Sequence, residues 1–213
     1  MNKILLILLY LILSQNANAL CQKNQIKMNI IMEPGEVVYH HDVSRRDFGR
    51  LISGKLNPNT LGLTVAQSRL KITGKPYIRQ EGNVRVCVGV QEINFYIGYD
   101  QIDVYIDRIY PKNSCNYRVI KDHEDYHVGV FQQAMTFFRP DLEKELKMAV
   151  ADIRPEYAYS SARAEQIMDK LFQRIHQRLE PLLNHINKKI AEKNNAIDTP
   201  ESYRETTALC PKW

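Results

Sequence analysis

The hydrophobic pattern of this chain changes its period near Pro111, and this change constrains the fold class more than any other feature. Before it, apolar and polar side chains alternate from Ile102 to Ile106, as in a half-buried strand. After it, apolar residues recur at helical spacing from Tyr117 to Phe138. Strands followed by helices favour an α+β fold over an alternating parallel sheet.

The other expected elements follow from shorter patterns. In chain order they are an irregular segment over 22–35, a strand over 36–41, a short helix within 44–56, an ambiguous stretch over 64–72, strands within 79–99, helices over 140–150 and 161–194, and a loop over 198–213. Asn116 is a reasonable N-cap for the first long helix. Pro140 should start a new helix, and Pro181 should kink the last one.

The first nineteen residues have the pattern of a secretory signal peptide. Lys3 precedes an apolar run over residues 4–13, and Ala17-Asn18-Ala19 supplies a small-residue cleavage site. The run is too short to cross a bilayer core of about 30 Å as a helix. The alternative is an uncleaved N-terminal anchor. We therefore expect an exported, periplasmic or extracellular protein, with residues 20–213 as a single domain and no membrane span after cleavage.

Four cysteines lie outside this segment. An even number in an exported chain predicts two disulfides, for which three pairings exist. We favour Cys21–Cys210, which would join the termini, and Cys87–Cys115, which would join a strand to the start of a helix. A zinc site made of these cysteines is less favoured, because none forms a C-x-x-C pair.

The charge of the chain argues against nucleic acid as a partner. The formal net charge is +5, but the basic residues are spread along the sequence and alternate with acidic ones. A nucleic-acid-binding protein gathers its basic residues on one face. We read the charge as solvated surface.

The residues HEDYH, from His123 to His127, form the pattern H-E-x-x-H inside the first long helix. Side chains four residues apart lie above one another on a helix, so both imidazoles can reach one metal ion. Glu124 lies beside them and could act as the general base on a water molecule. The alternative is a histidine cluster satisfied by hydrogen bonds. Because the motif lies on the apolar side of the helix, we expect His123 and His127 to bind Zn²⁺.

With this motif the sequence resembles the zincin metallopeptidases, and in particular a group of small exported bacterial zincin-like proteins of unassigned substrate. The resemblance covers about residues 84–210 and rests on HEDYH, the strand IDVYIDRIY, the turn at Ser114-Cys115 and the segment DTPESY. It implies a small, twisted, mainly antiparallel sheet followed by a helical half that carries the motif helix. It also implies that an edge strand, here Ile102–Ile106, aligns an extended peptide.

The resemblance also implies a third zinc ligand on a later helix. Gluzincins use a glutamate in the pattern E-x-x-x-D, which Glu165 and Asp169 match, with Glu165 as ligand and Asp169 bonded to a ligand histidine. The alternatives are Glu156, His176, Glu180 and His185. We interpret His40-His41 as surface or partly buried residues, and Asp198-Thr199-Pro200 as a turn in which a ligand role is the less favoured alternative.

The leading hypothesis is a secreted zinc-dependent peptidase whose substrate is a peptide or protein. The alternatives are a non-catalytic metal-binding or cell-envelope interaction protein and a purely structural disulfide-bonded module. The sequence leaves the substrate and the oligomeric state open.

Overall fold

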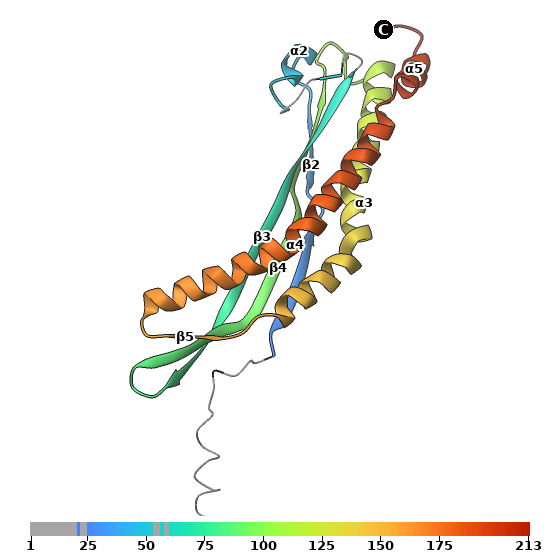
Figure 1. The fold of residues 1–213 in the computed structure, drawn as a ribbon. Coiled ribbons are helices and arrows are strands. Elements are labelled where there is room, and N and C mark those ends of the chain that lie inside the picture. Colours follow the sequence, from blue (N-terminus) through green and yellow to red (C-terminus); the bar gives the residue numbers. More distant parts are fainter. Residues whose placement is uncertain (1–20, 22–24, 53–55, 58–59) are drawn as a thin grey trace, which may run out of the picture.

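A computed structural model describes residues 21, 25–52, 56–57 and 60–213 (Figure 1). The predicted signal peptide, residues 1–19, lies outside the described residues. The elements are, in chain order, β1 (Lys27–Glu33), β2 (Glu36–His40), α2 (Arg45–Phe48), β3 (Gly62–Glu81), β4 (Arg85–Ile106), α3 (Cys115–Ala151), β5 (Glu156–Ala158), α4 (Ser161–Ile197) and α5 (Pro200–Ala208).

The sheet is built around β4. On one side β4 pairs with β3 in an antiparallel hairpin, from Gly62 opposite Ile106 to Glu81 opposite Arg85. Because β3 occupies this side along its whole length, the other strands share the second side. There β5 pairs antiparallel with the start of β4, while β1 and β2 pair parallel with its middle and end.

The strands β1 and β2 behave as two parts of one edge strand. Lys27 pairs with Glu92 and His40 pairs with Tyr105, so the register offset is the same in both strands. Pro34 and Gly35 interrupt the strand without shifting the register. Proline has no backbone N–H to donate to the ladder, so an interruption is expected there. Residues 22–35, expected to be irregular, therefore contain strand β1.

The prediction of a small, mainly antiparallel, zincin-like sheet is wrong. In the structure, the two N-terminal strands β1 and β2 run parallel to β4, and the hairpin of β3 and β4 is long. Alternation along one strand reports which face is buried and carries no information about the direction of its neighbour. The strand Ile102–Ile106 is also not an edge, because it pairs with β2 on one side and with β3 on the other.

The helical half packs against the sheet as α3 and α4, which also pack against each other (Figure 1). The predicted break at Pro140 does not occur, and α3 continues through it to Ala151. An interior proline costs about 3 kcal/mol. Burial of Phe138, Leu142 and Leu146 on both sides of Pro140 can offset that cost.

The last helix and the tail differ from the prediction at their ends. Ser160 caps α4, whose buried stripe includes Leu171, as expected. The tail was predicted to be a loop but forms α5, with Thr199 as N-cap and Pro200 in the first turn, a position that suits proline. Among the described residues, no helix is both long and apolar enough to cross a membrane.

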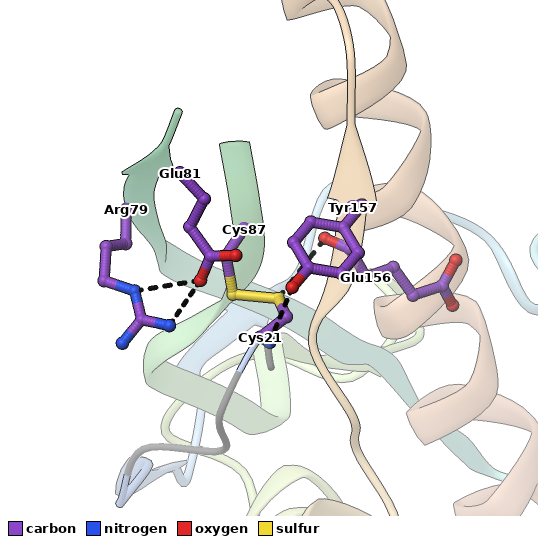
Figure 2. Close-up of a disulfide and its surroundings, with 6 residues drawn as sticks. All are labelled: Cys21, Arg79, Glu81, Cys87, Glu156 and Tyr157. Atoms are coloured by element: carbon purple, nitrogen blue, oxygen red, sulfur yellow. Dashed lines mark hydrogen bonds and ion pairs between the residues drawn. A yellow bond between two sulfur atoms is a disulfide. The ribbon is translucent and has the colours of Figure 1, made fainter. Parts of the chain in front are cut away.

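The two disulfides are Cys21–Cys87 and Cys115–Cys210, so the predicted pairing is wrong. Figure 2 shows Cys21 held against the start of β4, where its backbone N–H donates to the Tyr157 hydroxyl at 3.0 Å. The second disulfide ties the start of α3 to the segment after α5. Sequence spacing could not rank the three pairings, because it does not show which helix end the tail meets.

Replacing Gly98 by alanine should destabilise the sheet strongly. Gly98 has a φ of +147°, and an added Cβ would lie 1.8 Å from the Glu33 carbonyl oxygen on β1. We expect Gly98→Ala to lower the free energy of unfolding by at least about 3 kcal/mol, measured by urea denaturation without reductant. The control is Gly49→Ala, whose Cβ meets nothing within 4 Å and which should stay within about 1 kcal/mol of wild type. Equal stability of the two variants would contradict the parallel β1–β4 pairing.

Candidate metal centre

The motif residues lie on the buried side of α3. His123, Glu124 and His127 are 8%, 3% and 6% exposed, as the apolar pattern of the helix predicts. The helix begins two residues earlier than a cap at Asn116 would allow, because the Ser114 hydroxyl accepts a hydrogen bond from the Tyr117 backbone N–H. Three ionisable groups inside the protein need partners to offset the cost of their burial.

Asp198, directly after α4, supplies a carboxylate to both histidines. Its Oδ1 lies 3.2 Å from Nε2 of His123 and 3.2 Å from Nε2 of His127. Among the described residues, these three form the group with ligand atoms close enough to hold one metal ion, all within 4.8 Å of one another. Tetrahedral zinc with bonds of about 2.0 Å separates its ligand atoms by about 3.3 Å. The spacing between Asp198 and each histidine therefore fits zinc.

Asn194, near the end of α4, and Tyr203, on α5, orient this group. The Asn194 side-chain oxygen lies 3.0 Å from Nδ1 of His127 and accepts a hydrogen bond from its N–H, which directs Nε2 toward Asp198. The Tyr203 hydroxyl donates to Asp198 Oδ1 at 2.7 Å. Burial and then this hydrogen bond raise the pKa of Tyr203, so the hydroxyl keeps its proton.

His127 and Asp198 shift each other's proton affinity. Burial favours the neutral form of Asp198, but hydrogen bonds with His123, His127 and Tyr203 outweigh it and hold the pKa of the carboxyl below its ordinary value. Burial lowers the pKa of His127, but the hydrogen bond to Asp198 and the charge of Glu124 outweigh it and raise the pKa. When both ring nitrogens of His127 donate, the ring is an imidazolium, and a metal ion must replace its Nε2 proton.

Glu124 faces β3 beside the group. Its Oε2 accepts a hydrogen bond of 2.8 Å from the Thr64 hydroxyl, and burial raises the pKa of its carboxyl. Gly62 makes this approach possible, since a Cβ at that position would lie 2.7 Å from both Cγ and Oε1 of Glu124. A buried carboxyl with a raised pKa is suited to accept and return a proton.

A pocket of about 120 Å³ opens beside these side chains. Its lining consists of Thr60, Gly62, Leu63, Thr64, Glu124, His127, Phe131, Asn194, Asp198 and Tyr203. The pocket thus brings together the start of β3, the middle of α3 and the junction of α4 with α5. It has room for a few water molecules or one small group of a substrate.

Glu165 and Asp169, the predicted ligand and its partner, are not part of this group. Both are exposed and lie in the first turns of α4, whereas Asp198 follows its last turn. At a rise of 1.5 Å per residue, Glu165 and Asp198 are separated by roughly 50 Å. Asp198, interpreted from the sequence as a turn residue with a ligand role less favoured, caps α4 and also contacts both histidines.

His40 and His41 have other partners, consistent with partly buried structural residues. His40 Nε2 lies 2.7 Å from Asp103 Oδ1, and its ring stacks on Tyr105. His41 Nε2 lies 2.6 Å from the Tyr110 carbonyl oxygen.

The sequence patterns did not assign Asp198, Asn194 or Tyr203 to the metal centre. Asn194 and Asp198 have the four-residue spacing of one helical face, which is a weak signal. The Cys115–Cys210 disulfide brings the tail to the start of the motif helix, but the sequence did not distinguish this pairing from the other two. This pairing would have placed residues 198–209 beside His123.

Comparisons of this chain with protein-family models, with curated proteins and with solved structures give no match. The candidate centre therefore rests on its own geometry.

Replacing Asp198 by asparagine should weaken zinc binding by at least about 100-fold, since the loss of a partner that only orients a ligand already costs about 10- to 100-fold. Affinity is measured by competition with a chromophoric chelator. The control is Glu165→Gln, which removes the same charge at an exposed position and should leave the affinity unchanged. If Glu165→Gln weakens binding and Asp198→Asn does not, the assignment of the third ligand is wrong.

As the pH decreases, zinc affinity should begin to fall at a higher pH than it does for an ordinary histidine site. Because the pKa of His127 is raised, its Nε2 takes up a proton above the usual value of about 6.5 and then competes with the metal. The carboxyl of Asp198, with its lowered pKa, stays ionised over this range. Chelator competition between about pH 8 and about pH 6 measures the effect. An affinity that is constant across this interval would contradict it.

Proposed function

We propose that this protein is an exported zinc-dependent hydrolase that cleaves peptide bonds. The observation that carries the proposal is the position of Asp198 Oδ1, 3.2 Å from Nε2 of both motif histidines. Three protein ligands are the number that catalytic zinc sites use, with one position left for water or substrate. Two disulfides and the absence of a membrane-spanning helix from the described residues are compatible with export.

His123, His127 and Asp198 would hold the metal ion. A zinc ion held there would make water more acidic and polarise a substrate carbonyl. Asn194 would keep His127 in the orientation that directs Nε2 at the ion, and Tyr203 would fix the Asp198 carboxylate. These residues position the ligands and take no proton from the substrate.

Glu124 would transfer the protons of the reaction. Thr64 holds its Oε2, and the carboxylate can take a proton from the attacking water and pass it to the leaving amine. Burial, which raises the pKa of Glu124, brings it closer to the pH at which it must both accept and release a proton. Because Gly62 packs against this carboxylate, β3 fixes the distance between base and metal ligands.

The pocket sets a limit on the substrate. A volume of about 120 Å³ holds the group to be cleaved but not a folded chain. A substrate peptide would lie across the mouth, with Leu63 and Phe131 offering apolar contacts. Exported or envelope proteins and peptides are the substrates within reach of a secreted enzyme.

The test is hydrolysis of a quenched peptide library by the mature protein together with its zinc content. We expect Glu124→Gln to keep the zinc and to lose at least about 100-fold in activity, since a general base contributes about 10² to 10⁴. The control is Asp125→Asn at the next position, where the carboxylate bonds to Lys121 and Tyr39. This variant should keep its activity. A wild-type protein without zinc would contradict the proposal.

A second candidate function is non-catalytic metal binding. It is favoured because Asp198 and Tyr203, which help to enclose the small pocket, come from the segment that follows the last turn of α4. The tail of the chain itself thus partly closes the site. In that case the protein carries zinc, and wild type and Glu124→Gln are equally inert toward every peptide.

A further inference from the structure

A second, larger hollow lies at the end of the sheet beside α2. Its volume is about 970 Å³. Its lining consists of Ser44, Arg45, Arg46, Asp47, Gly49, Arg50, Leu56, Asp107, Arg108 and Ile109. Four arginines against two aspartates give this lining a formal charge of +2. None of these residues belongs to the candidate metal centre.

The two aspartates of the lining are already engaged. Asp107 is 4% exposed, and its oxygens accept hydrogen bonds from the backbone N–H groups of Arg45 and Ile109, each at 3.0 Å. It therefore holds the loop together from inside. Asp47 forms an ion pair of 3.2 Å with Arg50.

Arg46 and Arg108 present charge to the hollow without such a partner. Both are exposed, and neither forms an ion pair with a carboxylate of the described residues. They come from α2 and from the segment after β4, and the Arg108 backbone N–H donates to the Val43 carbonyl oxygen at 3.0 Å. This hydrogen bond and the Asp107 bonds hold the two arginine-bearing segments at fixed positions. The hollow is thus a preformed site of positive charge.

We propose that this hollow binds a ligand that carries closely spaced phosphate groups. A guanidinium presents its donors in a planar fork that matches the oxygens of a phosphate, and several arginines around one hollow suit several such groups. The volume is that of a small-molecule site. Ile109, 65% exposed, offers the ligand an apolar contact at the rim. The phosphate groups could belong to a soluble compound or to the headgroups of an anionic lipid.

The test measures binding of two probes to the mature protein. Inorganic triphosphate is titrated by calorimetry, and phosphatidylglycerol vesicles are tested by co-sedimentation. The variant Arg46→Gln/Arg108→Gln changes two exposed side chains, and its far-UV circular dichroism is compared with wild type. The control, Arg163→Gln/Arg178→Gln, removes the same charge from exposed positions on α4. Any triphosphate that binds at the candidate metal centre should be unaffected by either pair of substitutions. Only a difference in affinity between the two variants therefore reports binding in the hollow.

We expect Arg46→Gln/Arg108→Gln to weaken binding of at least one probe by about tenfold or more, because two charge-assisted contacts are lost. The control should stay within about twofold of wild type. A loss confined to triphosphate assigns a soluble ligand, and a loss confined to vesicles assigns a lipid headgroup. If neither probe binds, or if both variants lose affinity equally, the proposal is overturned. Zinc content and peptide hydrolysis are read separately, so failure here leaves the proposed function untouched.

Discussion

The structure depends on one extended backbone pairing, the antiparallel hairpin of β3 with β4. It runs from Gly62 opposite Ile106 to Glu81 opposite Arg85 and leaves the second side of β4 for β5, β1 and β2 in a row. Because the hairpin fixes β3 along its whole length, it also fixes Gly62 and Thr64, which contact Glu124 on α3. The geometry around the candidate base therefore follows from strand pairing.

A second constraint brings the tail to the motif helix. The Cys115–Cys210 disulfide joins the start of α3 to the segment after α5, and between these points Asp198 meets both histidines. The carboxylate offsets the cost of burying two imidazoles, and Tyr203 in turn fixes the carboxylate. The polar residues of the centre thus satisfy one another, and a zinc ion would use the same atoms.

Sequence patterns predicted the parts of the centre that are local. His123, Glu124 and His127 lie within one helical turn, so their common face follows from the period of the helix. The third ligand, the carboxylate of Asp198, depends on how α4 packs along α3. The E-x-x-x-D pattern at Glu165 fits the chemistry but lies at the wrong end of a helix of 37 residues. A short pattern cannot distinguish two ends of a helix that are roughly 50 Å apart.

The sequence by itself determined that a strand-rich half precedes a helical half, which face of α3 is buried, and that two disulfides form. These follow from hydrophobic period, from side-chain geometry within one element and from an even number of cysteines in a chain with the pattern of a signal peptide. Only the tertiary structure decided the parallel pairing of β1 and β2, the partner of each cysteine and the role of Asp198. All three join residues more than 60 positions apart, and such contacts depend on how complete elements pack.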